Sequence, residues 1–292
     1  MQIIRKTCHP LSLKGIRKRQ AANFWPQRSV VVTFDDGYAD NFHAAREVLE
    51  ANDIPATVFV TSGMVDSQKE FWWDELERIF LSTTKLPTHL EITINHQVFS
   101  WVLNDRNEER GSLAWNVLDD RPPSSRQRLY LELMSLMHDI DLPTRESVLS
   151  ELAVWAGIDR NSVRHDYRAV SIAELHSLPH KGLIEIGAHT ITHPSLFAIP
   201  LTTQADEILG SKAELEKILS HPVESFAYPF GERRDYSGES IKLVRDAGFT
   251  CACSNYPGLV NSTRDPYQLP RYIVRDWDGE TFARKLKNWF HE

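Results

Sequence analysis

Short apolar runs alternate with single helical stretches in two separate parts of the chain, and this alternation constrains the fold more than any other feature. "SVVVTF" at 29–34 and "ATVFV" at 56–60 lie on either side of a predicted helix at about 41–51. Short strands joined by single helices are typical of βαβ units and of a parallel sheet covered on both faces. The sequence therefore predicts an α/β protein, either an α/β barrel or a doubly wound sheet.

The same alternation returns after residue 183 and continues to the C-terminus. The later runs again have the length of strands and are separated by helical or turn-forming segments. The predicted strands are "LIEIGAH" (183–189), "SFAYPF" (225–230), "FTCACS" (249–254) and "YIVRD" (272–276), and the predicted helices cover about 202–220, about 237–247 and the last residues of the chain.

Between these two parts, from about 66 to about 170, the alternation stops. Residues 90–102 alternate apolar and polar side chains around Asn95-His96 and predict a β-hairpin, while the rest of the segment has mainly helical spacing. We predict an N-terminal segment at 1–28 and one domain at 29–292, interrupted by a mostly helical insertion that is a candidate lid.

Composition and charge exclude several classes of protein. The 292 residues carry a net charge of -7 and are 41% hydrophobic, which is enough for a large core. The one basic run, "KGIRKRQ", is short and typical of a solvated surface, so no nucleic-acid partner is expected. No apolar run reaches the roughly 18 residues of a membrane span, and the first residues lack the apolar centre of a secretion signal. A cytoplasmic protein without an integral membrane segment is expected.

Polar side chains follow two of the predicted strands. Asp35 and Asp36 come directly after the first strand, and "GAHTITH" places His189 and His193 at the end of a later one. In parallel α/β folds the ligand site lies outside the carboxyl ends of the strands. Two imidazoles and one carboxylate suit zinc and related divalent metals. The three cysteines are too few and badly spaced for a disulfide framework or a thiolate metal site.

A bound cation would explain why two carboxylates adjoin, because it stabilises the ionised form of one and leaves the other to act as a base. Each pattern also has an ordinary interpretation. An Asp-Asp-Gly sequence is often a surface turn, and a pair of histidines four residues apart is often structural. Their joint occurrence at strand ends favours a metal site.

Three motifs together resemble the polysaccharide deacetylase, or NodB-homology, family of carbohydrate esterases: "TFDDG", "HTITH" and "FAYPFG". The resemblance covers about 29–65 and 183–275 and leaves the insertion unexplained. It implies a distorted (β/α) barrel and a hydrolase that removes an acetyl group from an N-acetylated sugar. It also implies one divalent metal ion, usually zinc, with cobalt or nickel as alternatives.

Carried over by position, the resemblance assigns a role to each matching residue. Asp36, His189 and His193 would hold the metal, and Asp35 would be the base that activates water. The backbone N–H of Phe230 would stabilise the oxyanion. The residues expected to contact the substrate are Tyr228, Pro229, Phe230 and Gly231 of the third motif, together with Trp73 of "EFWWDELE", whose aromatic face could stack on a sugar ring.

Two departures from the family pattern remain. Many relatives carry an arginine where this chain has Ala227, and Arg271 is the best substitute for orienting the base, although a structural arginine is an equal alternative. The histidine that many relatives use as general acid has only His291 or His9 as candidates here, and each could be a surface histidine.

The sequence therefore predicts a metal-dependent N-deacetylase whose substrate is an N-acetylated glycan in a polysaccharide, an oligosaccharide or a glycolipid precursor. One alternative is a hydrolase of another linear or cyclic amide, which release of acetate from sugars would separate. Another is a catalytically silent glycan-binding protein; the missing acid histidine favours it, and the retained base argues against it. The sugar, the native metal and the oligomeric state are left open.

Overall fold

The computed structural model describes residues 1–104, 115, 122, 124–177 and 182–291. The chain divides into two compact units, one formed by Met1–Ser67 with Ala169–Glu292 and the other by Gln68–Arg168. Residues 1–28, predicted as an N-terminal segment, belong to the first unit. The second unit lies within the predicted insertion at about 66–170, whose use as a lid stays a prediction.

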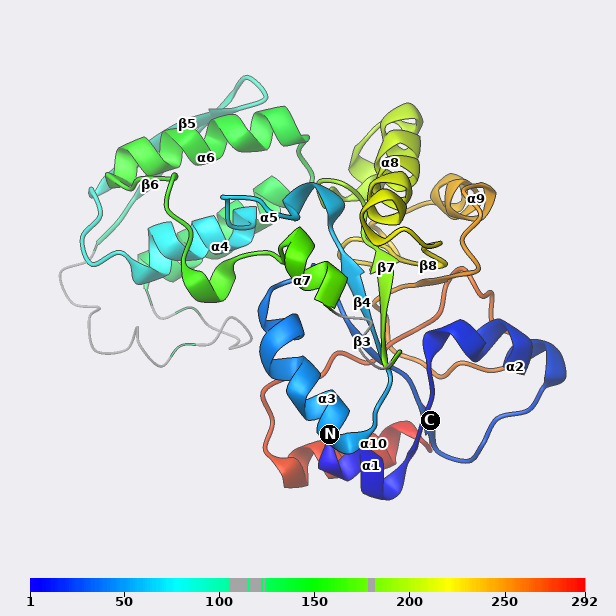
Figure 1. The fold of residues 1–292 in the computed structure, drawn as a ribbon. Coiled ribbons are helices and arrows are strands. Elements are labelled where there is room, and N and C mark those ends of the chain that lie inside the picture. Colours follow the sequence, from blue (N-terminus) through cyan, green and yellow to red (C-terminus); the bar gives the residue numbers. More distant parts are fainter. Residues whose placement is uncertain (105–114, 116–121, 123, 178–181, 292) are drawn as a thin grey trace. The chain divides into compact units, whose positions relative to one another are not determined.

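The first unit is built on a five-stranded parallel sheet with the strand order β3-β4-β7-β8-β9 (Figure 1). Neighbouring strands are parallel throughout, so their carboxyl ends meet at one edge of the sheet. Every residue of β4 is buried, as expected for a strand in the middle of a covered sheet. The strands are β3 (Val32–Phe34), β4 (Ala56–Val60), β7 (Ile184–Ala188), β8 (Ser225–Ala227) and β9 (Cys251–Cys253).

Helices connect and flank these strands, and their apolar faces complete the core of the first unit. Leu49, Leu215 and Val244 come from three different helices and are fully buried with Val58 of β4. The helices are α1 (Gln2–Thr7), α2 (Ile16–Ala22), α3 (Arg46–Asn52) after a π-helical turn at Asn41–Ala45, α7 (Ile172–Ser177), α8 (Leu201–Leu219), α9 (Gly238–Asp246) and α10 (Gly279–Trp289).

Two of the sequence predictions for this unit are wrong in detail. The strand predicted at 29–34 is divided at Val31 into β2 (Ser29–Val30), which pairs with β1 (His9–Pro10), and β3. The strand predicted at 272–276 does not form; beyond β9 a single parallel bridge joins Cys253 to Leu269. Pro270 follows that bridge and has no amide hydrogen to donate to a ladder. The sheet therefore ends at β9 on one side and at β3 on the other.

The second unit contains the predicted hairpin and helices. In the hairpin Ile94 pairs with Gln97 around a two-residue turn, and both turn residues, Asn95 and His96, have positive φ, as a type I′ turn requires. Ser124 and Asp141 cap the two long helices with their side-chain oxygens. The elements are α4 (Trp72–Glu77) with a π-helical turn at Arg78–Ser82, β5 (His89–Ile94), β6 (Gln97–Val102), α5 (Ser125–His138) and α6 (Leu142–Ala156).

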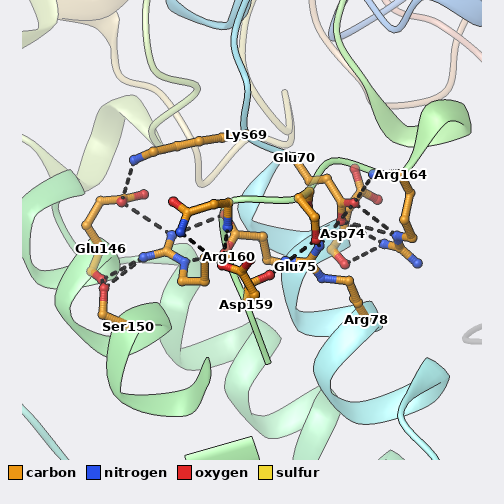
Figure 2. A network of polar contacts seen from close by, with 12 residues as sticks. Lys69, Glu70, Asp74, Glu75, Arg78, Glu146, Ser150, Asp159, Arg160 and Arg164 are labelled. Carbon is orange, nitrogen blue, oxygen red and sulfur yellow. Dashed lines mark hydrogen bonds and ion pairs between the residues drawn. The ribbon is translucent and has the colours of Figure 1, made fainter. Parts of the chain in front are cut away.

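A network of ion pairs joins the elements of the second unit (Figure 2). The guanidinium of Arg160 donates two hydrogen bonds to the carboxylate of Glu75 on α4, at 2.6 and 3.1 Å, and a third to Ser150 Oγ on α6. Arg164 binds the carboxylate of Glu70, whose side chain is fully buried, in the same two-pronged way. Paired and hydrogen-bonded charges of this kind fix geometry, and they become costly when one partner is lost. Of the helices in the described ranges, none is long and apolar enough to cross a membrane.

Candidate active site

Asp35 and Asp36 stand at the carboxyl end of β3, and the backbone there turns their side chains toward different partners. Asp36 has φ of 72°, in the left-handed region that aspartate tolerates better than most residues. Gly37 follows with φ of 85°, and a Cβ there would come within 3.1 Å of Val60. The glycine of "TFDDG" is thus required both by its backbone angle and by the close approach of β4.

His189 and His193 follow β7, which pairs with β4 in the middle of the sheet. The loop between them is tightly held. Thr190 and His193 both have positive φ, and the Thr190 hydroxyl accepts a hydrogen bond from the backbone N–H of His193 at 3.1 Å. A positive φ is a genuine outlier for a β-branched residue such as Thr190, and such strain is characteristic of functional sites.

Glu207 of α8 holds this loop through three hydrogen bonds. Its buried carboxylate accepts hydrogen bonds from the backbone N–H groups of Ile191 and Thr192, at 2.7 and 2.9 Å, and from the Thr192 hydroxyl at 2.6 Å. These charge-assisted bonds satisfy the polar groups of a bent backbone. Sequence reasoning missed Glu207, because nothing distinguishes it from any other glutamate on an amphipathic helix.

The side chains of Asp36, His189 and His193 converge, and their candidate donor atoms all lie within 4.8 Å of one another. Oδ1 of Asp36 is 3.4 Å from Nε2 of His189 and 3.3 Å from Nε2 of His193. Donors about 2.0–2.1 Å from a tetrahedral zinc ion would be separated by about 3.3 Å. Two of the observed separations therefore already match those of a zinc ligand set.

The protonation of His189 also suits a metal ligand. Its Nδ1 lies 2.8 Å from the backbone carbonyl of Ala227, which can only accept a hydrogen bond, so Nδ1 carries the proton. In the neutral imidazole this leaves the lone pair on Nε2, which faces Asp36. A backbone carbonyl that orients a histidine in this way is the usual outer partner of a metal-bound histidine.

Asp35 is held by Arg271. Two hydrogen bonds of 2.7 Å join Nη1 and Nη2 of the guanidinium to the two carboxylate oxygens. Arg271 is in turn fixed by the carbonyl of Ser254 at 2.7 Å and the hydroxyl of Thr33 at 3.1 Å. Burial raises the pKa of Asp35, but the charge and hydrogen bonds of Arg271 outweigh burial and hold that pKa below its ordinary value. Asp35 is therefore an ionised acceptor at neutral pH.

The neighbouring carboxylate is stabilised from the other side. Burial also acts to raise the pKa of Asp36. When His189 and His193 are protonated, their hydrogen bonds and charges outweigh burial and hold this pKa far below its ordinary value; when they are neutral, a bound cation would supply the compensating charge. Each aspartate thus has a separate partner, and the two negative charges coexist without sharing a proton.

The third motif does not place all of its side chains where a substrate could reach them. Tyr228 is 1% exposed, stacks on Tyr236 and donates its hydroxyl to the carbonyl of Tyr267 at 3.0 Å. The sequence assigned Tyr228 a substrate contact; its side chain instead packs in the core, because the strand β8 that leads into the motif is buried. Pro229 is buried as well.

Phe230 and Gly231 lie nearer to the histidines. The ring of Phe230 meets the ring of His193 edge to face, with centroids 4.7 Å apart, and Phe230 has φ of 58°. Gly231 has φ of 72°, and a Cβ there would lie 2.9 Å from the backbone N of Asn255. This left-handed pair turns the chain sharply after Pro229. The oxyanion role of the Phe230 N–H stays a prediction.

The remaining candidates fall in different places. Trp73 belongs to the second unit, where it stacks on Phe71 with centroids 4.7 Å apart, and its contact with a substrate stays a prediction. His9 is exposed and pairs with Ser29, the first residue of β2. Asp35 lies six residues after Ser29, which is about 20 Å in an extended chain. His9 is therefore not placed to act as general acid beside Asp35.

The comparisons with known proteins identify the family of the chain. The sequence model of the family described as polysaccharide deacetylase matches residues 24–110 and 156–252. The chain belongs to the polysaccharide deacetylase family. The family match includes Asp35, Asp36 and both histidines, whereas Arg271 lies outside it. No curated protein matches the chain.

Solved structures confirm the fold expected of this family. The deacetylase PplD of Streptococcus pyogenes, in complex with acetate, aligns over 98% of this chain and 83% of its own, at 15% identity and a TM-score of 0.57. IcaB from Ammonifex degensii aligns over 100% and 86%, at 15% identity and a TM-score of 0.58. The BpsB deacetylase domain from Bordetella bronchiseptica aligns over 94% and 82%, at 16% identity and a TM-score of 0.54. The predicted distorted (β/α) barrel is thereby confirmed.

Proposed function

We propose that this protein is a metal-dependent hydrolase that removes the N-acetyl group from an N-acetylated sugar, in a polysaccharide, an oligosaccharide or a glycolipid precursor. One observation carries the proposal: the donor atoms of Asp36, His189 and His193 converge beside a second carboxylate, Asp35, which Arg271 keeps ionised. A structural cluster does not need a second ionised carboxylate beside the donor atoms. Membership of the polysaccharide deacetylase family supports the same reaction class.

Asp36, His189 and His193 would hold one divalent ion, and the donor set of two nitrogens and one oxygen favours zinc, with cobalt or nickel as alternatives. When bound, the ion supplies a Lewis acid that polarises the amide carbonyl and lowers the pKa of water. Glu207 and the Ala227 carbonyl keep the two histidines in place for this purpose.

The residues of the chain account for the movement of the proton. Asp35 accepts a proton from the attacking water at its carboxylate, and Arg271 positions that carboxylate through its two hydrogen bonds. The amide nitrogen must gain one proton before the C–N bond breaks. The proton that Asp35 accepted can pass to that nitrogen, so the proton count does not require a second acid.

The first test measures bound metal per chain by elemental analysis, because it does not depend on knowing the sugar. We expect about one divalent ion in the parent protein and its loss in both Asp36→Ala and His193→Ala. Asp206→Asn is the matched control, since Asp206 is exposed on α8 and is not a donor. An absence of metal after loading with zinc, cobalt or nickel would contradict the hydrolase and support the glycan-binding alternative.

The second test measures acetate released from N-acetylated chito-oligosaccharides, and the new amine formed on hydrolysis of linear and cyclic amides that contain no sugar. The proposal expects acetate from the sugars, and no product from either set in Asp36→Ala. Hydrolysis of the sugar-free amides alone would support the alternative hydrolase.

A further inference from the structure

A cavity of about 1080 Å³ lies along the open edge of the sheet in the first unit. Every residue from Arg28 to Asp35 lines it, and residues 269–275 line it as well. Asp35 and Arg271 are both part of the wall, so the cavity is continuous with the candidate active site. The cavity is slightly larger than the roughly 300–1,000 Å³ of ordinary ligand pockets.

The walls of this cavity are mainly apolar. The lining includes Phe282, Leu286 and Trp289 from one face of α10, together with Val32 and Ile273. A sugar or a polysaccharide carries hydroxyl groups that need hydrogen-bond partners, and apolar walls do not provide them. A hydrocarbon chain, in contrast, gains free energy from each methylene that such walls remove from water.

Four charged residues line the cavity, and three of them are arginines. Arg271 is neutralised by Asp35. Arg28 and Arg275 form no ion pair with any carboxylate in the described ranges, and the guanidinium of Arg28 lies 5.7 Å from the ring centroid of Phe290. The cavity thus combines apolar walls with two uncompensated positive charges, which complements an anionic amphiphile.

The N-terminal segment of the same chain adds to the positive charge of the cavity. Residues 1–28 contain seven lysines and arginines and no aspartate or glutamate, in a protein of net charge -7. Arg5 and Lys14 are paired, with Asp53 at 3.5 Å and Glu224 at 3.1 Å, and the others add a positive potential that attracts anions. The basic run that the sequence favoured as a solvated surface therefore follows strand β1, next to this cavity.

From these observations we propose that the substrate is an N-acetylated sugar joined through a phosphate group to a lipid, and that the cavity binds the lipid chain. The proposal rests on the proposed function, because it places the sugar at Asp35. From Asp35 the extended segment 28–35 runs about 23 Å along the cavity to Arg28, which leaves room for a long hydrocarbon chain. Arg275 follows Arg271 by four residues, at most about 14 Å of extended backbone, within reach of a phosphate attached to the sugar.

Isothermal titration calorimetry on the full, zinc-loaded chain tests the proposal with three probes: dodecyl phosphate, dodecyl maltoside and inorganic phosphate, the two amphiphiles below their micelle concentrations. We expect dodecyl phosphate to bind about 10-fold more tightly than dodecyl maltoside, because only the phosphate can pair with Arg275. Inorganic phosphate, which lacks the chain, should bind much more weakly than dodecyl phosphate.

Three variants distinguish binding of the probes in the cavity from nonspecific binding elsewhere on the protein. Arg275→Gln should weaken dodecyl phosphate about 10-fold and leave dodecyl maltoside unchanged. Val274→Asp should weaken both, and it should fold normally because Val274 is 58% exposed on the cavity wall. Val154→Asp, the same change at an 83% exposed valine in the second unit, should weaken neither.

The proposal is overturned if the two amphiphiles bind equally and Val274→Asp binds both as the parent does. It is also overturned if the protein binds phosphatidylglycerol vesicles but not dodecyl phosphate, which would indicate a bilayer surface as the ligand. Asp35→Asn should bind dodecyl phosphate at least as tightly as the parent, since the variant removes the negative charge that neutralises Arg271 and probe binding needs no catalysis. Failure of this proposal is therefore distinguishable from failure of the deacetylase proposal, which metal content and acetate release decide.

Discussion

Both units contain carboxylates that are at least partly buried, but the two units neutralise them differently. In the second unit Glu75 is paired with Arg160 through two hydrogen bonds, and the pair is complete. In the first unit Asp35 has an equivalent partner in Arg271, whereas Asp36 faces two histidines. Asp35 therefore resembles the structural Glu–Arg pairs of the second unit, whereas the adjacent Asp36 does not.

The difference between the two units shows what separates a structural ion pair from a ligand set. A guanidinium brings a permanent charge and a planar fork that occupies both carboxylate oxygens. A neutral imidazole brings a lone pair, and in His189 the other nitrogen is already committed to the Ala227 carbonyl. Asp36 and its histidines thus form a donor set that a cation would complete, whereas Glu75 and Arg160 need nothing further.

Asp35 tests this comparison most severely, because its arginine makes it look structural. We expect Asp35→Asn to lower kcat about 10²- to 10⁴-fold, since an amide cannot accept the proton from water. Metal content should stay at the parental level. Acetate release and elemental analysis on the same preparation measure both, and Glu75→Gln is the control that leaves kcat unchanged. A kcat within a few-fold of the parent would mean that Asp35 is a structural partner only.

The ion pair of the second unit should show the opposite behaviour. Arg160→Met leaves the Glu75 carboxylate, which is 4% exposed, without its cation, and should cost about 3–5 kcal/mol of stability. Urea unfolding followed by circular dichroism measures this loss. The double variant Glu75→Gln/Arg160→Met removes the unpaired charge and should recover a large part of it. If the single and double variants are equally unstable, packing of the Arg160 stem rather than charge pairing is what holds this unit together.

Glu207 should show a smaller effect, specific to the metal. Glu207→Gln weakens the charge-assisted bonds that hold the His193 loop, so the affinity for zinc should fall about 10- to 100-fold while kcat at saturating zinc changes little. Competition with a zinc chelator measures the affinity, and Asp206→Asn on the same helix is the control. An unchanged affinity would show that the loop keeps its shape without Glu207.

The residues of the site could be predicted to the extent that they lie in local patterns. Asp35, Asp36, His189 and His193 each follow a strand, and the parallel sheet brings strand ends together, so their proximity was predictable. Arg271 was predicted only as a candidate, because its partner lies 236 residues away and no local pattern specifies that contact.

Other features depended on tertiary packing that the sequence does not display. The run at 272–276 has the composition of a strand but has no partner strand in the described sheet, and Pro270 interrupts the ladder before it. Tyr228 lies in a motif that resembles a binding loop, yet its side chain turns into the core. Such outcomes depend on which neighbours a segment meets after folding, and local composition carries no record of them.

Arg271→Gln is expected to have the smallest effect, because it changes the pKa of Asp35 without removing the carboxylate. In the parent, Arg271 holds the pKa of Asp35 below its ordinary value against the effect of burial. Without the guanidinium, burial dominates and the pKa of Asp35 rises. Because Asp35 must be ionised to accept a proton, the acid limb of kcat/KM should move to higher pH, with activity retained on the alkaline side. Arg271→Lys keeps a positive charge and should move the limb less, although it cannot reproduce the two-pronged contact. A fall in kcat/KM by the same factor at every pH would instead show that Arg271 only positions the carboxylate. The pairing of Asp35 with Arg271 would then have the same purely structural role as the pairing of Glu75 with Arg160.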